Sequence, residues 1–204
     1  VNPLLHDNLP YDVQRDLVPL TLLFRATFLL WTGGSGRFAN LSALLEAARA
    51  KPRSVSYASL GHGHASQVAV ESFAHAAGIQ MLHVPFKDVG ALMTATVAGD
   101  VDMTAFSLNT MNGLYQQGKL RPLAVAARQR LAALPNVPTL PEAGGPAVEM
   151  HPWAALVAVA GTPAPVLAQL EADIAAALAS PEVRQQAEQT GFELTPSTPQ
   201  ALRE

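Results

Sequence analysis

The chain has 204 residues, of which 49% are hydrophobic and 14% charged, with a formal net charge of −3 and no cysteine. This composition suits one domain or two small lobes and argues against disorder. It excludes disulfides, thiolate metal sites and cysteine nucleophiles. The absence of a basic run argues against nucleic-acid binding, and the apolar stretches are shorter than a membrane-spanning helix requires.

Expected strands and helices alternate along the chain. The strands are short apolar runs at 20–31, 55–58, 81–84, 103–106, 122–126 and 154–160. The helices have apolar residues at helical spacing and lie at 41–50, 65–77, 89–98, 164–179 and 181–189. This alternation is typical of parallel βαβ units, whose ligands bind beyond the carboxyl ends of the strands.

Two long apolar segments, 20–31 and 153–160, are not tied to a neighbouring helix. We interpret them as crossover strands that join two lobes. Trp31 and Trp153 lie near these crossovers, where we expect both to be packed. The expected division is 1–29 in the first lobe, 30–150 as a continuous second lobe, and 151–204 returning to the first.

The turn after strand 55–58 is the main candidate for binding. Gly61 and Gly63 permit positive φ and close approach of a ligand to the backbone. The N–H groups at the start of the following helix attract an anion, and Ser59 adds a hydroxyl. A tight turn without a ligand is the alternative. The spacing fits neither a dinucleotide fingerprint nor a Walker loop.

Further polar residues carry weaker signals. Ser107 and Asn109 follow strand 103–106, where they would face a cleft or cap a turn. His62 and His64 form a His-x-His pair, which indicates either polar residues of a pocket or a metal site, although no third ligand is evident. There is no nucleophile elbow, so we assign no catalytic residue, expect no cofactor and predict a binding protein rather than an enzyme.

Short blocks spread along the chain carry a family resemblance. They include Asn2-Pro3, Leu9-Pro10-Tyr11-Asp12, Tyr57-Ala58-Ser59, His83-Val84-Pro85-Phe86-Lys87, Asp100-Val101-Asp102-Met103, Gly118-Lys119-Leu120-Arg121-Pro122, Leu134-Pro135-Asn136-Val137-Pro138-Thr139 and Gly161-Thr162-Pro163. In this order and spacing, the chain resembles the Bug-type periplasmic receptors of tripartite tricarboxylate transporters.

The resemblance implies a type II periplasmic-binding-protein-like α/β fold with two lobes joined by two crossover strands. Such receptors are exported, capture a small carboxylate-containing ligand between the lobes without catalysis, and deliver it to the permease subunits of a membrane transporter. No signal peptide is recognised in this chain. The residues expected to bind the ligand are Ser59, Gly61, Gly63, His64, Gln67, Ser107 and Asn109.

The chain also departs from the family pattern. Relatives usually carry Thr at the position of His64 and His at that of Gln67, so which carboxylate binds stays open. The resemblance further implies that the N-terminal part of the first lobe is lacking. A half-built lobe would expose a sheet edge and apolar surface, which predicts a partner, a dimer or a domain swap. A ligand-sensing module for a signalling partner, or a truncated form that no longer binds ligand, are the alternative functions.

Overall fold

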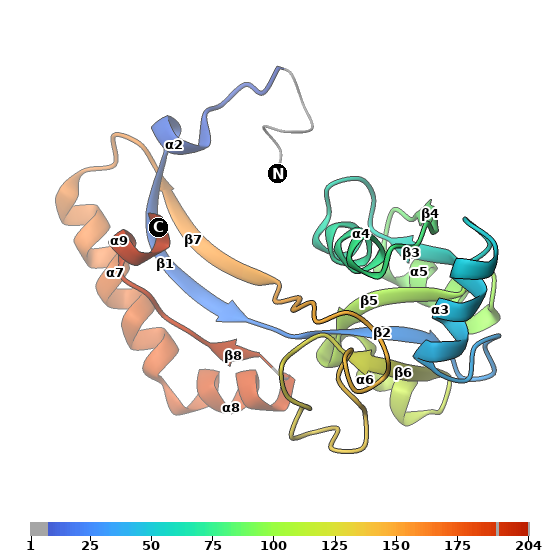
Figure 1. The fold of residues 1–204 in the computed structure, drawn as a ribbon. Helices are drawn as coiled ribbons and strands as arrows, with labels where there is room; N and C mark the ends of the chain where they lie inside the picture. The colour runs from blue at the N-terminus through green and yellow to red at the C-terminus, as the bar shows by residue number, and fades with distance from the viewer. Residues whose placement is uncertain (1–7, 191, 204) are drawn as a thin grey trace. The chain divides into compact units, whose positions relative to one another are not determined.

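A computed structural model of the chain describes residues 8–190 and 192–203, so the Asn2-Pro3 block lies outside the described residues. The chain divides into two compact units (Figure 1). Unit 1 comprises Val1–Ala26 and Pro152–Glu204, and unit 2 comprises Thr27–His151. In the described part of the chain, no helix is long and apolar enough to cross a membrane.

Unit 2 contains a five-stranded mixed sheet with the order β4-β3-β5-β2-β6. Its strands are β2 (Phe28–Gly33), β3 (Ser56–Ser59), β4 (Leu82–Pro85), β5 (Met103–Ser107) and β6 (Leu120–Val125). Its helices are α3 (Leu41–Ala50), α4 (Ala65–Ala77), α5 (Val89–Ala98) and α6 (Leu108–Gln116). Strand β3 runs parallel to β4 and β5, as the βαβ pattern predicts.

The sheet of unit 2 also contains one strand that does not belong to a βαβ unit, β2. This strand runs antiparallel to both of its neighbours, β5 and β6. It lies between β5 and β6, which are parallel to each other. The rule that favours parallel pairing applies to strands joined by a helical crossover, and no helix of unit 2 precedes β2.

Both faces of the sheet in unit 2 are packed. Alternate residues of β2 contribute to two different hydrophobic clusters, because successive side chains of a strand point to opposite faces. Leu30 joins the cluster around Leu44 and Phe73, and Trp31 joins the cluster around Leu92. All five of these side chains are fully buried.

Helix ends in unit 2 follow their capping residues. The Asn40 side chain accepts a hydrogen bond from the Ala43 N–H at 2.9 Å and begins α3. Asp88 does the same for α5. Helices α4 and α5 end at Gly78 and Gly99, both in the left-handed conformation that glycine adopts without strain.

Unit 1 contains a three-stranded antiparallel sheet with the order β7-β1-β8. Its strands are β1 (Leu17–Arg25), β7 (Trp153–Val159) and β8 (Glu193–Leu194). Its helices are α2 (Val13–Asp16), α7 (Ala164–Ala179), α8 (Pro181–Thr190) and α9 (Pro199–Arg203). Asp12 begins α2 by accepting hydrogen bonds from the N–H groups of Gln14 and Arg15.

The expected crossover at 20–31 passes from one sheet to the other, but as two strands rather than one, because the segment forms the end of β1 and most of β2. The change of sheet occurs at Ala26 and Thr27. The Ala26 N–H donates to the Pro152 carbonyl and the Phe28 N–H to the Met150 carbonyl, both at 2.9 Å. A continuous apolar run does not reveal such a change, because both halves have the same composition.

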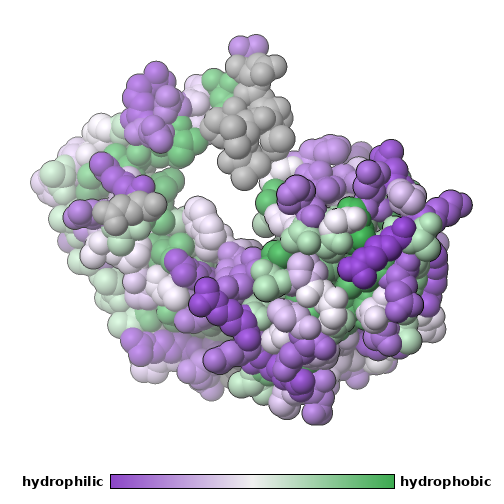
Figure 2. Space-filling model, viewed as in Figure 1, coloured by the Kyte–Doolittle hydropathy of each residue, from purple (hydrophilic) through white to green (hydrophobic). Residues whose placement is uncertain are grey.

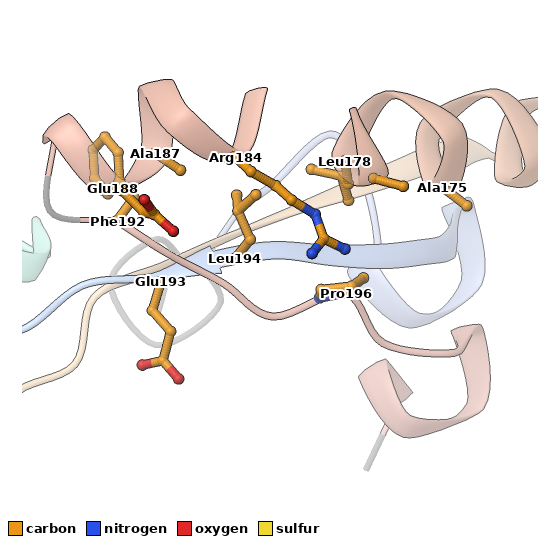
Figure 3. A pocket seen from close by; sticks show the side chains of 10 residues that line it. Ala175, Leu178, Arg184, Ala187, Glu188, Phe192, Glu193, Leu194 and Pro196 are labelled. Carbon is orange, nitrogen blue, oxygen red and sulfur yellow. The ribbon is translucent and has the colours of Figure 1, made fainter. Parts of the chain in front are cut away.

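Unit 1 is loosely packed. None of the residues of α7 is buried. A hollow of about 510 Å³ separates α7 and α8 from the segment around β8, and the Arg184 side chain extends into it beside Leu178 and Leu194 (Figure 3). Trp153 is 63% exposed, so the expectation that it packs was wrong. Trp31, by contrast, is buried and donates its indole N–H to the Phe106 carbonyl at 2.9 Å.

Candidate functional site

The candidate site is the turn between β3 and α4 in unit 2. Strand β3 ends at Ser59 and α4 begins at Ala65. Gly61 and Gly63 have φ of 101° and 76°, in the left-handed region. A Cβ added at Gly61 would meet no atom within 4 Å, so the backbone conformation, rather than lack of space, requires glycine there.

Most N–H groups of this turn are already engaged. The Gly61 N–H donates to Ser59 Oγ at 3.1 Å, and the Gly63 N–H donates to Gln67 Oε1 at 2.7 Å. Within the described residues, the N–H groups of His62 and Ala65 have no hydrogen-bond partner. Both residues are exposed. The donors available to an anion are therefore these two groups, which flank the glycine whose amide is occupied by Gln67.

His64 is the N-cap of α4. Its Nδ1 atom lies 3.1 Å from the backbone nitrogen of Ser66 and 2.8 Å from the Ser66 hydroxyl. A backbone N–H only donates, so Nδ1 accepts and the imidazole proton resides on Nε2. Burial lowers the pKa of His64, which favours the same neutral form. His64 thus begins the helix and retains one N–H donor on the other side of its ring.

Ser59 is fully buried, and its contacts are structural. Its Oγ lies 2.6 Å from Nε2 of His83, which belongs to the neighbouring parallel strand β4. The His83 ring stacks on Tyr57, with ring centroids 4.9 Å apart. The Tyr57 hydroxyl donates to the Glu71 carboxylate on α4. These contacts fix the turn to β3, β4 and α4 at once.

The titrating groups beneath the turn have displaced pKa values. Burial, and then the hydrogen bond to Glu71, raise the pKa of Tyr57. Burial lowers the pKa of His83, and the nearby His62 lowers it further, whereas Glu71 acts in the opposite direction. The His62 and His83 rings meet edge to face with centroids 5.0 Å apart. Both shifts favour neutral side chains in this layer.

Gln67 supports the turn from the first part of α4. Besides accepting from Gly63, it places its amide nitrogen 3.3 Å from Nδ1 of His62. Among the described residues, no group of three or more His, Asp or Glu side chains is placed to hold a metal ion. In this structure His64 caps the helix, and His62 contacts Gln67 and His83.

Ser107 and Asn109 lie at the same end of the sheet as the β3–α4 turn. Strands β3 and β5 are parallel neighbours, so their carboxyl ends lie at one edge. The ring of Phe106, the residue before Ser107, is 6.4 Å from that of His64. Ser107 is buried and its Oγ lies 3.1 Å from the Thr110 hydroxyl, while Asn109 is half-buried in α6.

Three residues beneath the turn were not among those expected to matter: Tyr57, Glu71 and His83. Tyr57 and Glu71 are 14 residues apart, a separation at which residues of one helix or strand are not neighbours. They meet only because α4 packs back on β3. His83 reaches Ser59 because β4 pairs with β3 in a register that aligns Tyr57 with His83. No local sequence signal carries that register.

Comparison with known proteins assigns this chain to a family. A family model described as tripartite tricarboxylate transporter family receptor matches residues 1–204. A protein of Pseudomonas sp. strain P51, described as a UPF0065 protein in the tcbD-tcbE intergenic region, is 33% identical over 203 residues. The match covers 99% of this chain and 60% of that relative, so the chain spans less than two thirds of its length.

Solved structures show the same fold. R. palustris Rpa4515 with adipate superposes with a TM-score of 0.88 at 28% identity, over 97% of this chain and 66% of that one. MatC from Rhodopseudomonas palustris with bound malate gives a TM-score of 0.82 at 27% identity, over 92% and 64% of the two chains. A periplasmic transporter gives a TM-score of 0.87 at 30% identity, over 99% and 68%. The type II periplasmic-binding-protein-like fold expected from the sequence is confirmed, and the chain belongs to the tripartite tricarboxylate transporter receptor family.

Proposed function

We propose that the chain is a non-enzymatic solute-binding protein that captures a small carboxylate at the β3–α4 turn of unit 2. The observation that carries this proposal is the pair of N–H groups of His62 and Ala65, which have no hydrogen-bond partner among the described residues. They belong to exposed residues on either side of Gly63 and His64, at the start of α4. A helix N-terminus attracts negative charge without a charged side chain. The adipate and malate structures of related proteins support a carboxylate as the ligand.

The expected site residues take distinct roles in this proposal. Gly61 and Gly63 shape the turn, His64 offers its Nε2–H, and Gln67 holds the Gly63 amide in place. Ser59, being fully buried, positions the turn rather than touching the ligand. Ser107 and Asn109 border the site from the end of β5.

The family and its periplasmic relatives support a role in transport. We infer that the ligand-loaded protein acts in the periplasm and passes its ligand to the permease subunits of a tripartite transporter. Ligand binding without a permease partner would favour the sensing alternative. Absence of all carboxylate binding would favour a form that no longer binds ligand.

The proposal is tested by calorimetric titration of the 204-residue chain with adipate, malate and citrate, and with adipamide as the uncharged counterpart. We expect at least one carboxylate to bind and adipamide not to bind. At 100 times its Kd, a ligand stabilises the folded state by ~2.7 kcal/mol, which an unfolding titration also detects. Turnover of any of these acids, or binding of none, would contradict the proposal.

One substitution examines the backbone donor itself. Ala65→Pro removes the Ala65 N–H at the first position of α4, where proline fits a helix without loss of an internal hydrogen bond. Because a hydrogen bond to a charged group contributes about 1.5–3 kcal/mol, affinity for the carboxylate should fall by at least about tenfold. The matched control is Ala164→Pro at the first position of α7 in unit 1, which should leave affinity unchanged. Equal binding by both variants would place the anion elsewhere.

A further inference from the structure

Gln67 occupies one of the backbone donors of the proposed anion site. The Gly63 N–H donates to Gln67 Oε1 at 2.7 Å. In sequence, this N–H lies between those of His62 and Ala65, which have no partner among the described residues. An amide oxygen has two acceptor lone pairs, as has each oxygen of a carboxylate, but the amide carries no net charge. Gln67 therefore takes the place in which a ligand oxygen would accept from Gly63.

The orientation of the Gln67 amide follows from its two contacts. A backbone N–H only donates, so the atom that faces Gly63 is the amide oxygen. The amide nitrogen then faces Nδ1 of His62, 3.3 Å away, and donates to it. The amide of Gln67 is thus held at both ends, and its acceptor atom is directed at the turn.

The Gln67 side chain has access to water if it leaves this position. Gln67 is half-buried, and both His62 and Ala65 are exposed. Figure 2 shows hydrophilic side chains on the surface of unit 2 around α4. An amide group that moves away from Gly63 can therefore exchange its hydrogen bonds for hydrogen bonds to water, which keeps the cost of its displacement low.

A charged ligand gains more from the Gly63 N–H than Gln67 does. Hydrogen bonds to an ionised acceptor are roughly twice as strong as those between neutral groups. A carboxylate therefore gains by displacing Gln67, whereas an uncharged amide only replaces one neutral bond by another. We propose that Gln67 is an internal competitor that makes the β3–α4 turn select carboxylates over uncharged amides. This inference rests on the proposed function and identifies a residue that sets the selectivity of the same site.

Two substitutions of Gln67 have opposite expected effects in calorimetric titration. Gln67→Ala frees the Gly63 N–H, so the acids among adipate, malate and citrate that bind the native chain should bind about threefold to tenfold more tightly. Gln67→Glu places a carboxylate on the same N–H, so their affinity should fall by at least about tenfold. The matched control is Gln116→Ala, which truncates an exposed glutamine of α6 and should leave affinity unchanged.

The direction of the change separates a competitor from a structural support. If Gln67 only supported the turn, Gln67→Ala would weaken binding of the acids. Amide NMR gives a second readout. In the native chain, the binding acid should shift the resonances of the Gly63 N–H and of the Gln67 side-chain amide together, whereas adipamide should shift neither. In Gln67→Ala, adipamide should shift the Gly63 resonance.

The outcomes distinguish failure of this inference from failure of the proposed function. Acid binding that is unchanged or weaker in Gln67→Ala, or that leaves the Gln67 amide resonance in place, would overturn the role of Gln67 and leave the proposed function standing. Absence of binding of all three acids, to the native chain and to Gln67→Ala alike, would overturn both.

Discussion

The strands β2 and β7 have similar apolar sequences and opposite environments. All six residues of β2 are buried, between β5 and β6 and between two hydrophobic clusters. Strand β7 lies at an edge, and four of its seven residues are exposed. Apolar content therefore marks a strand as suited to burial, whereas its neighbours in space decide whether it is buried.

The two longest stretches of helix differ in the same way. Helix α4 in unit 2 buries Ala69, Val70 and Phe73 along one side. Helix α7 in unit 1 is longer and richer in Ala and Leu, yet none of its residues is buried. Because burial of apolar area is the main favourable contribution to folding, unit 2 should account for most of the stability of the chain.

Truncation of one leucine in each unit should destabilise the two units unequally. Leu44 in α3 is fully buried, so Leu44→Ala should cost about 2–5 kcal/mol of unfolding free energy. Leu170 in α7 is 38% exposed, so Leu170→Ala should cost below about 1 kcal/mol. Urea unfolding combined with hydrogen exchange resolved by segment would separate the two units. Equal costs would mean that α7 is buried in solution by something beyond unit 1.

Much of the fold was predictable from sequence because its signals are local. The capping residues Asn40 and Asp88, and the helix-ending Gly78, set the helix bounds of unit 2 to within a residue or two. The position of the β3–α4 turn followed from Gly61 and Gly63. Local signals do not specify pairing across the sheet, so the sequence alone did not show that β2 lies antiparallel between β5 and β6.

The candidate site was predictable in place but not in detail. The glycines indicated an amide-lined turn, yet the sequence does not tell that Gln67 occupies the Gly63 amide or that Ser59 is buried under His83. Those contacts depend on where α4 and β4 pack. Trp153 illustrates the same dependence on packing. Its large aromatic side chain led to a prediction of burial, but in the structure it lies exposed.

Beneath the turn, the hydroxyl of Tyr57 provides the next test. Tyr57→Phe keeps the buried ring and its stacking on His83 but removes the hydrogen bond to the Glu71 carboxylate. Hydrogen bonds to charged groups contribute about 1.5–3 kcal/mol, and the exposure of Glu71 places the expected loss near the lower end. Tyr115→Phe, in the same unit, is the matched control and should change unfolding free energy by less than about 0.5 kcal/mol. A neutral Tyr57→Phe variant would show that the contact between β3 and α4 does not depend on this bond.

Acid should destabilise unit 2 by a smaller amount than these substitutions. Burial lowers the pKa of His64 and of His83 from the ordinary value of 6.5, so the folded state binds protons less readily than the unfolded state. Their contribution is fully present above pH 6.5 and decreases as the pH falls below it. Protonation of His64 at Nδ1 also removes the acceptor that caps α4, and a cap contributes about 1 kcal/mol before solvent screening reduces it.

His64→Asn isolates this contribution. Asparagine retains a side-chain acceptor at the N-cap and does not titrate, so the variant should match the native chain at pH 8 and lose less stability at pH 5. His75→Asn, at an exposed position in the last turn of the same helix, should retain the native dependence on pH. Urea unfolding at the two pH values measures the difference. If His64→Asn and the native chain lose stability in parallel, then His64 is not held neutral by its cap, and an imidazolium at the start of α4 would become the anion donor in place of Nε2–H.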